Sequence, residues 1–182
     1  GTSVLVNQAV LNLFGSAAVA AFSAASKIHM LSEQVAVSFG TAMATYAGQN
    51  YGAGKAGRVQ EGLRKCALAC EAITLGIMVI MTAFGGVMSS WFIDGYHPEV
   101  IQQAHLYLFI SALFYPALTM LFLYRNTLLG LGNGVTPMLA GVCELLSRMI
   151  GAPVLGHFFG FTGLCWINPI AWVTASGLLF LS

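Results

Sequence analysis

The residues of this 182-residue sequence most suited to chemistry are a few ionisable side chains within long apolar segments. Glu144 and Arg148 have the i,i+4 spacing that pairs two side chains on one helix face, with the acid nearer the N-terminus. Lys27 and Glu33 are six residues apart, so they do not pair directly on one helix. Because each such group costs roughly 2.5–3.5 kcal/mol at the centre of a membrane helix, we expect all four to face a polar interior.

These four groups fit more than one interpretation. Glu144 and Arg148 form either a self-neutralising pair between helices or part of a proton, ion or substrate pathway. Lys27 favours a functional role, because packing alone does not explain a lone lysine in an apolar segment. Glu33 is compatible with either interpretation.

Amide side chains extend this set of candidates. Asn7, Gln8 and Asn12 give the first apolar segment a polar stripe, which suits an interior cavity or a hydrogen bond between helices. Asn126 lies beside a basic residue near the end of a later segment. The candidate residues of a substrate or ion pathway are therefore Lys27, Glu33, Glu144, Arg148, Asn7 and Asn126.

The sequence predicts neither an enzyme nor a metal site. It contains no nucleophile elbow, zinc-protease motif or phosphate-binding loop. The four histidines are scattered without metal-ligand spacing, and the four cysteines fit small buried apolar thiols. Glu71 follows a basic segment, which favours a group that reaches the membrane interface or pairs with a neighbouring helix. We therefore expect no catalytic residue, no metal and no cofactor other than a coupling ion.

The composition identifies the environment in which these residues must be placed. Apolar residues make up 58% of the chain, charged residues only 7%, and the mean hydropathy is +0.81. A soluble domain carries roughly 25% charged residues, so both a soluble monomer and a disordered chain are excluded. The net charge of +1 argues against nucleic-acid binding. An integral membrane protein remains.

Charge-free runs separated by glycine, proline and basic residues predict an all-α transmembrane bundle of about six helices. The first is too short to span a bilayer and the last has no closing flank, so we expect a fragment that begins and ends inside helices. Pro116, Pro153 and Pro169 are expected to cause gentle kinks or to act as bending points. The expected helices run to about residue 14, then over 17–47, 58–84, 98–129, 137–158 and from 162 onward.

The basic residues predict the orientation. Lys and Arg cluster in the connection at 48–65, and Arg125 precedes the connection at 130–135, whereas the alternate connections near 15–16, 85–97 and 159–161 carry neither. Since basic loops stay on the cytoplasmic side, the connections at 48–65 and 130–135 are expected to be cytoplasmic.

Five stretches, taken together and in this order, resemble the multidrug and toxic compound extrusion (MATE) transporters, and the resemblance covers nearly the whole chain. They are AVAAF at 18–22, GQNYGAGK at 48–55, RNTLLGLGN at 125–133, ELLSR at 144–148 and NPIAW at 168–172. The resemblance implies that residues 1–182 form a single lobe, the C-terminal half of a twelve-helix transporter, with its first and last helices truncated.

The resemblance further implies a secondary antiporter that exports amphipathic or cationic drugs and toxins in exchange for sodium or protons. Its expected partners are the lipid bilayer, a small cationic substrate and a missing N-terminal lobe, and its expected location is a cell membrane, the bacterial inner membrane. Some members carry acids in the helices that match residues 1–14 and 98–129. Here residues 1–32 hold no acid, and none lies between Glu99 and Glu144, so coupling would use Glu33, Glu144 or the other lobe.

Two alternatives to a drug antiporter remain open. A related flippase for lipid-linked saccharides would use Lys27, Arg125 and Arg148 to bind a phosphate-bearing head group. A truncated membrane scaffold would transport nothing.

Overall fold

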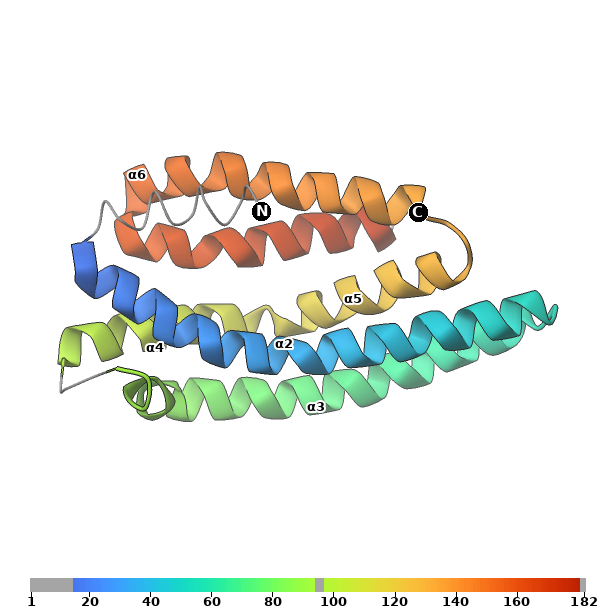
Figure 1. Cartoon of the computed structure of the whole chain (residues 1–182), viewed down its shortest axis with the longest axis horizontal. Helices are drawn as coiled ribbons and strands as arrows, with labels where there is room; N and C mark the ends of the chain where they lie inside the picture. Colours follow the sequence, from blue (N-terminus) through green and yellow to red (C-terminus); the bar gives the residue numbers. More distant parts are fainter. Residues whose placement is uncertain (1–14, 94–96, 181–182) are drawn as a thin grey trace.

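The structure, a computed structural model, describes residues 15–93 and 97–180, and these form α-helices without any strand (Figure 1). The predicted all-α fold class is therefore confirmed. The first expected helix, with Asn7, lies outside the described residues. The described helices are α2 (Gly15–Gly52), α3 (Ala56–Ser90), α4 (Pro98–Leu113), α5 (Tyr115–Gly130) and α6 (Val135–Phe180).

Several of these helices have the dimensions of membrane spans. Among the described residues, α3 and α6 are each long and apolar enough to cross a bilayer, and α4 with α5, bent by 52°, would add a third span if the pair is counted as one. The 38-residue α2 is long enough but does not meet the same test of apolar content. Polar residues of α2, among them Lys27 and Glu33, line a pocket described below, which accounts for part of this difference.

The expected single helix over 98–129 is wrong, because the chain breaks at Phe114 between α4 and α5. Phe114 has φ −105° and ψ 7°, and its amide donates to the Ser111 carbonyl at 3.1 Å in a tighter turn than an α-helix. Pro116, two residues on, has no amide hydrogen and its ring would clash with the carbonyl four residues earlier. Pro116 therefore lies beside a sharp bend, which fits the expected bending point rather than the expected gentle kink.

The break expected at 159–161 is confirmed. Gly160 has φ 60° and ψ −141°, values open to glycine, and the two arms of α6 double back on one another there (Figure 1, orange and red). A Cβ at Gly163 would run into the backbone carbonyl of Leu155, so the two arms meet closely just after the turn.

The helix ends alternate between the two ends of the bundle. The α2–α3 and α5–α6 connections lie at one end in Figure 1, whereas the end of α3, the start of α4 and the turn at Gly160 lie at the other. This arrangement agrees with the predicted topology, in which the connections with basic residues share one side of the membrane. The sidedness itself stays a prediction.

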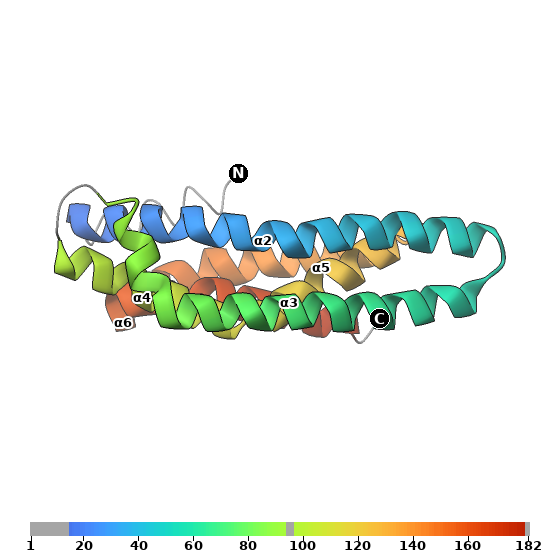
Figure 2. The same ribbon diagram turned by 90° about the horizontal axis from the view of Figure 1, so that it is seen from below.

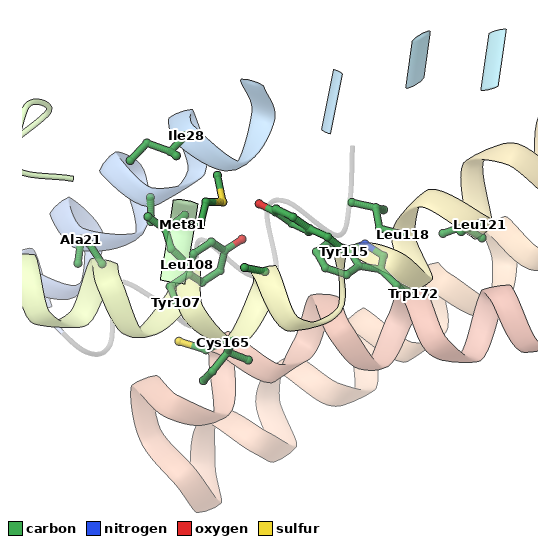
Figure 3. Close-up of a cluster of buried hydrophobic side chains, with 14 of the residues drawn as sticks. Ala21, Ile28, Met81, Tyr107, Leu108, Tyr115, Leu118, Leu121, Cys165 and Trp172 are labelled. Carbon is green, nitrogen blue, oxygen red and sulfur yellow. The ribbon is translucent and has the colours of Figure 1, made fainter. Parts of the chain in front are cut away.

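The bent pair of α4 and α5 forms the centre of the lobe. It packs against α2 and α3 on one side and against α6 on the other (Figures 1 and 2). Tyr107, Leu108 and Leu121 from this pair are buried, and they belong to one cluster with Met81 of α3 and Trp172 of α6 (Figure 3). Because α6 joins the lobe mainly through α4 and α5, the shape of this pair decides how α6 faces α2.

Small residues allow α2 and α5 to approach closely. A Cβ at Gly130 would collide with the backbone carbonyl of Ala44, and a Cβ at Gly48 would come within 3.1 Å of the Gly130 carbonyl oxygen. Glycine is therefore required at this crossing because a side chain would have no room there. The backbone conformation itself would accept other residues.

We expect Gly130→Ala to destabilise the lobe by about 1–3 kcal/mol, the usual cost of inserting a methyl group where no space exists. The matched control is Gly76→Ala, because Gly76 is also helical and a Cβ there meets no atom within 4 Å. Thermal unfolding of the purified protein in detergent measures both. Equal melting temperatures for the two variants would contradict the close approach.

Candidate functional site

A pocket of about 500 Å³ lies between α2, α4 and α6. Three of the predicted site residues, Lys27, Glu33 and Arg148, line it together. The structure therefore brings charges from two distant parts of the sequence to one place. The remaining lining residues are Phe22, Ser23, Ser26, His29, Met30, Tyr107, Asn168 and Trp172.

The inner wall of this pocket is aromatic. The imidazole of His29 stacks on Tyr115 and Trp172, with ring centroids 5.5 and 5.4 Å apart, and its Nδ1 lies 2.8 Å from the Tyr115 hydroxyl. Tyr107 meets the edge of the same imidazole at 6.4 Å. These rings are almost wholly buried, so they form a tightly packed backing to the pocket.

Glu33 is the carboxylate that this pocket exposes. Its Oε2 is 3.9 Å from Nε2 of His29, longer than a hydrogen bond. The Glu33 side chain remains 32% exposed, against 10% for His29. A cation that enters the pocket can therefore reach this carboxylate without breaking a short hydrogen bond.

Glu144, by contrast, is held between two arginines. Its Oε1 accepts a hydrogen bond from Arg148 at 2.5 Å and its Oε2 accepts one from Arg125 at 3.1 Å, and all three side chains are less than a quarter exposed. The predicted pairing of Glu144 with Arg148 is confirmed, whereas Arg125 was not predicted as a partner. This arginine–glutamate–arginine clamp ties α5 to the first arm of α6 and fixes Arg148 beside the pocket.

Lys27 lines the pocket from α2, six residues before Glu33. Its Nζ is 5.4 Å from the centroid of the Phe92 ring, a distance at which a cation is attracted to an aromatic face. No ion pair joins Lys27 to Glu33 among the described residues, in agreement with their spacing on α2. Both nevertheless line the same pocket.

Asn126 lies apart from these groups. Its Nδ2 donates to the Phe122 carbonyl at 2.8 Å, and the side chain packs against Gly40 of α2. It does not line the pocket. Asn7, the other amide candidate, lies outside the described residues.

The sequence alone did not single out the neutral residues of the pocket. Asn168 Nδ2 donates to the Tyr107 hydroxyl at 3.0 Å and so connects α6 to α4. The signals present were indirect: His29 precedes Glu33 by one helical turn, and Asn168 and Trp172 belong to a stretch on which the family resemblance rests. Among the described residues, no three His, Cys, Asp or Glu side chains are grouped as metal ligands.

A comparison of the sequence with models of protein families shows which family the chain belongs to. The MatE family model matches residues 2–154, most of the chain. The chain belongs to the MatE family. Its members are transporters rather than enzymes, and they are multi-pass integral membrane proteins. A search of curated proteins gave no match.

Solved structures share the fold of this MatE lobe. A multidrug resistance MATE transporter of the MOP superfamily, in an outward-facing conformation, superposes with a TM-score of 0.88 at 16% identity. A MOP superfamily transporter from Pyrococcus furiosus, described as having a binding pocket of reverse polarity, gives 0.84 at 16% identity. A MATE protein in complex with MaL6 gives 0.79 at 19% identity.

These alignments cover 98% of this chain but only 39–40% of the solved proteins. The described lobe therefore corresponds to less than half of such a transporter.

We expect Glu144→Gln to destabilise the protein by on the order of 3 kcal/mol, because two partly buried arginines would lose their common counter-charge. The control is Glu61→Gln, which removes an exposed carboxylate paired with Lys65 on α3 and should have no measurable effect. Denaturation of the purified protein in detergent compares them. If Glu144→Gln were as stable as Glu61→Gln, the clamp would contribute nothing to the fold.

Proposed function

We propose that the complete protein is a secondary antiporter that exports amphipathic or cationic organic compounds in exchange for sodium ions or protons. Membership of the MatE family supports export of drugs or toxins in general. In this proposal residues 1–182 supply one lobe, and a second lobe completes the transport pathway. The location proposed for it is the bacterial inner membrane.

The observation that carries this proposal is the chemical make-up of the pocket. The half-buried Phe22 and the exposed Met30 provide an apolar surface, and Glu33 provides a negative charge that the ligand can reach. An amphipathic cation needs both. Because an ionisable group at membrane depth is costly, a carboxylate exposed to this pocket is more readily explained by ion or substrate binding than by packing.

Competition for one carboxylate would couple the two movements. Glu33 holds either the coupling ion or the cationic substrate, so arrival of the ion from outside releases the substrate there. Arg148 and Lys27 line the same pocket and weaken cation binding by repulsion, which keeps the substrate releasable. The coupling ion is the only non-protein component that this mechanism requires.

Glu144 has a different role in this proposal. Its two arginine partners already satisfy it, so binding a cation there would first require the clamp to open. We assign Glu144 to positioning Arg148 and assign coupling to Glu33. Glu33 is the more exposed of these two acids, and in this proposal it performs the exchange.

Export of a fluorescent cationic dye from cells that make the complete protein tests the antiport. The sodium and proton gradients are collapsed separately, and we expect export to stop with one of them and to continue with the other. Cells with a vector lacking the gene measure background export. Absence of export in every condition, with the protein correctly inserted, would contradict antiport and favour a non-transporting lobe.

A flippase for lipid-linked saccharides is the second candidate function. Its specific support is that Lys27 and Arg148 both line the pocket, where they suit a phosphate group. The reverse polarity described for the binding pocket of the Pyrococcus furiosus transporter is a property of that protein. It is a reason to compare an anionic ligand with a cationic one for this chain.

A competition assay separates the two candidates. The purified complete protein is loaded with the cationic dye and titrated with either a second organic cation or a long-chain isoprenoid phosphate. For the antiporter we expect displacement by the cation at concentrations at least tenfold lower than by the phosphate. The reverse order would favour the flippase.

A further inference from the structure

A second pocket, of about 670 Å³, lies between α3, α5 and the second arm of α6, and it shares no lining residue with the first. Its volume falls within the range of small-molecule sites, about 300–1,000 Å³. The residues that line it are Glu71 of α3, Pro116, Ala117, Met120 and Tyr124 of α5, and Val173, Ser176, Gly177 and Phe180 of α6.

The walls of this second pocket are almost entirely apolar. The rings of Tyr124 and Phe180 meet edge to face, with centroids 5.5 Å apart. The Ser176 hydroxyl donates to the Val173 carbonyl at 3.1 Å, so its hydrogen is used within its own helix. Glu71 is therefore the single charged group among the lining residues.

The carboxyl group of Glu71 lacks a partner where one is needed. Its Oε1 is buried, and no donor from residues 15–93 or 97–180 forms a hydrogen bond to it. No Lys, Arg or His nitrogen in those ranges lies within 4.0 Å of the group. A buried acceptor without a donor is costly, so the expected pairing of Glu71 with a neighbouring helix is not found in the described part.

The other two acids of the lobe interior differ from Glu71. Glu144 has two arginines, and Glu33 faces a pocket that also contains Lys27 and Arg148. The negative charge of Glu71 faces only apolar walls. Charge complementarity therefore calls for a ligand that brings one positive charge and otherwise consists of apolar groups.

We propose that this second pocket binds a hydrophobic ammonium that carries at least one N–H group. Its N–H group donates to Oε1 of Glu71, and its alkyl or aryl body lies among Met120, Val173 and Phe180. A quaternary ammonium has no N–H and would leave Oε1 unsatisfied, so the site selects for the ammonium's hydrogens as well as for its charge. This site goes beyond the proposed antiport and does not depend on it.

Equilibrium binding of dansylcadaverine, a fluorescent hydrophobic primary amine, to the complete protein in nanodiscs tests the proposal. Its N,N,N-trimethyl derivative is the matched probe, with the same charge and no ammonium N–H. We expect the primary amine to bind at least tenfold more tightly than the derivative, the effect of one hydrogen bond to a charged group. Glu71→Gln should weaken binding of the primary amine to a similar extent.

A second variant keeps Glu71 intact. A Cβ at Gly177 meets no atom within 4 Å, so Gly177→Leu can fill the pocket without disturbing its walls and should abolish amine binding. Glu61→Gln, on the exposed face of the same helix α3, should leave binding unchanged.

Glu33→Gln locates the site, because it alters the first pocket and leaves the second untouched. The first pocket would also take this amphipathic cation if the proposed antiport is right, so the two probes and the other variants are compared in the Glu33→Gln background, where we expect amine binding at the second pocket to remain. Equal affinity for the two probes would overturn the proposal. So would binding in the Glu33→Gln background that survives both Glu71→Gln and Gly177→Leu, or the complete loss of amine binding in Glu33→Gln alone.

Discussion

The cost of placing charge inside an apolar helix bundle is the constraint on which this lobe depends. Glu144 meets it with two arginines from different helices, which neutralise the carboxylate, leave the clamp with one net positive charge and place the Arg148 guanidinium beside the first pocket. Glu33 and Glu71 meet it differently, since each faces a pocket. The positions of unneutralised carboxylates thus coincide with the spaces where ligands can bind.

The bent pair of α4 and α5 positions the side chains of the first pocket and of the arginine clamp. The break at Phe114 allows Tyr107 of α4 to line the first pocket while Tyr115, at the start of α5, contacts His29. Arg125, further along α5, then reaches the first arm of α6 and holds it in place.

Much of the fold followed from the sequence, because apolar runs of membrane length and their glycine and basic flanks are local signals. The pairing of Glu144 with Arg148 followed from helix periodicity. Arg125 as a second partner could not be predicted, since it depends on how α5 packs against α6. The interruption of the helix expected over 98–129 was not predicted, because proline bends some membrane helices without ending them, as Pro153 and Pro169 inside the arms of α6 illustrate. The neutral pocket residues gave no charge signal, so only packing brings them together.

The proposed mechanism requires the coupling ion and the cationic substrate to compete for Glu33 in the first pocket. Binding of a radiolabelled cationic substrate to the complete protein, measured over a range of sodium and proton concentrations in the wild type and in Glu33→Gln, tests it most directly. The account predicts that the apparent Kd of the wild type rises in proportion to the concentration of the coupling ion. It also predicts that the Kd of Glu33→Gln is independent of that ion. Equal ion dependence in the two proteins would contradict it and place the exchange elsewhere.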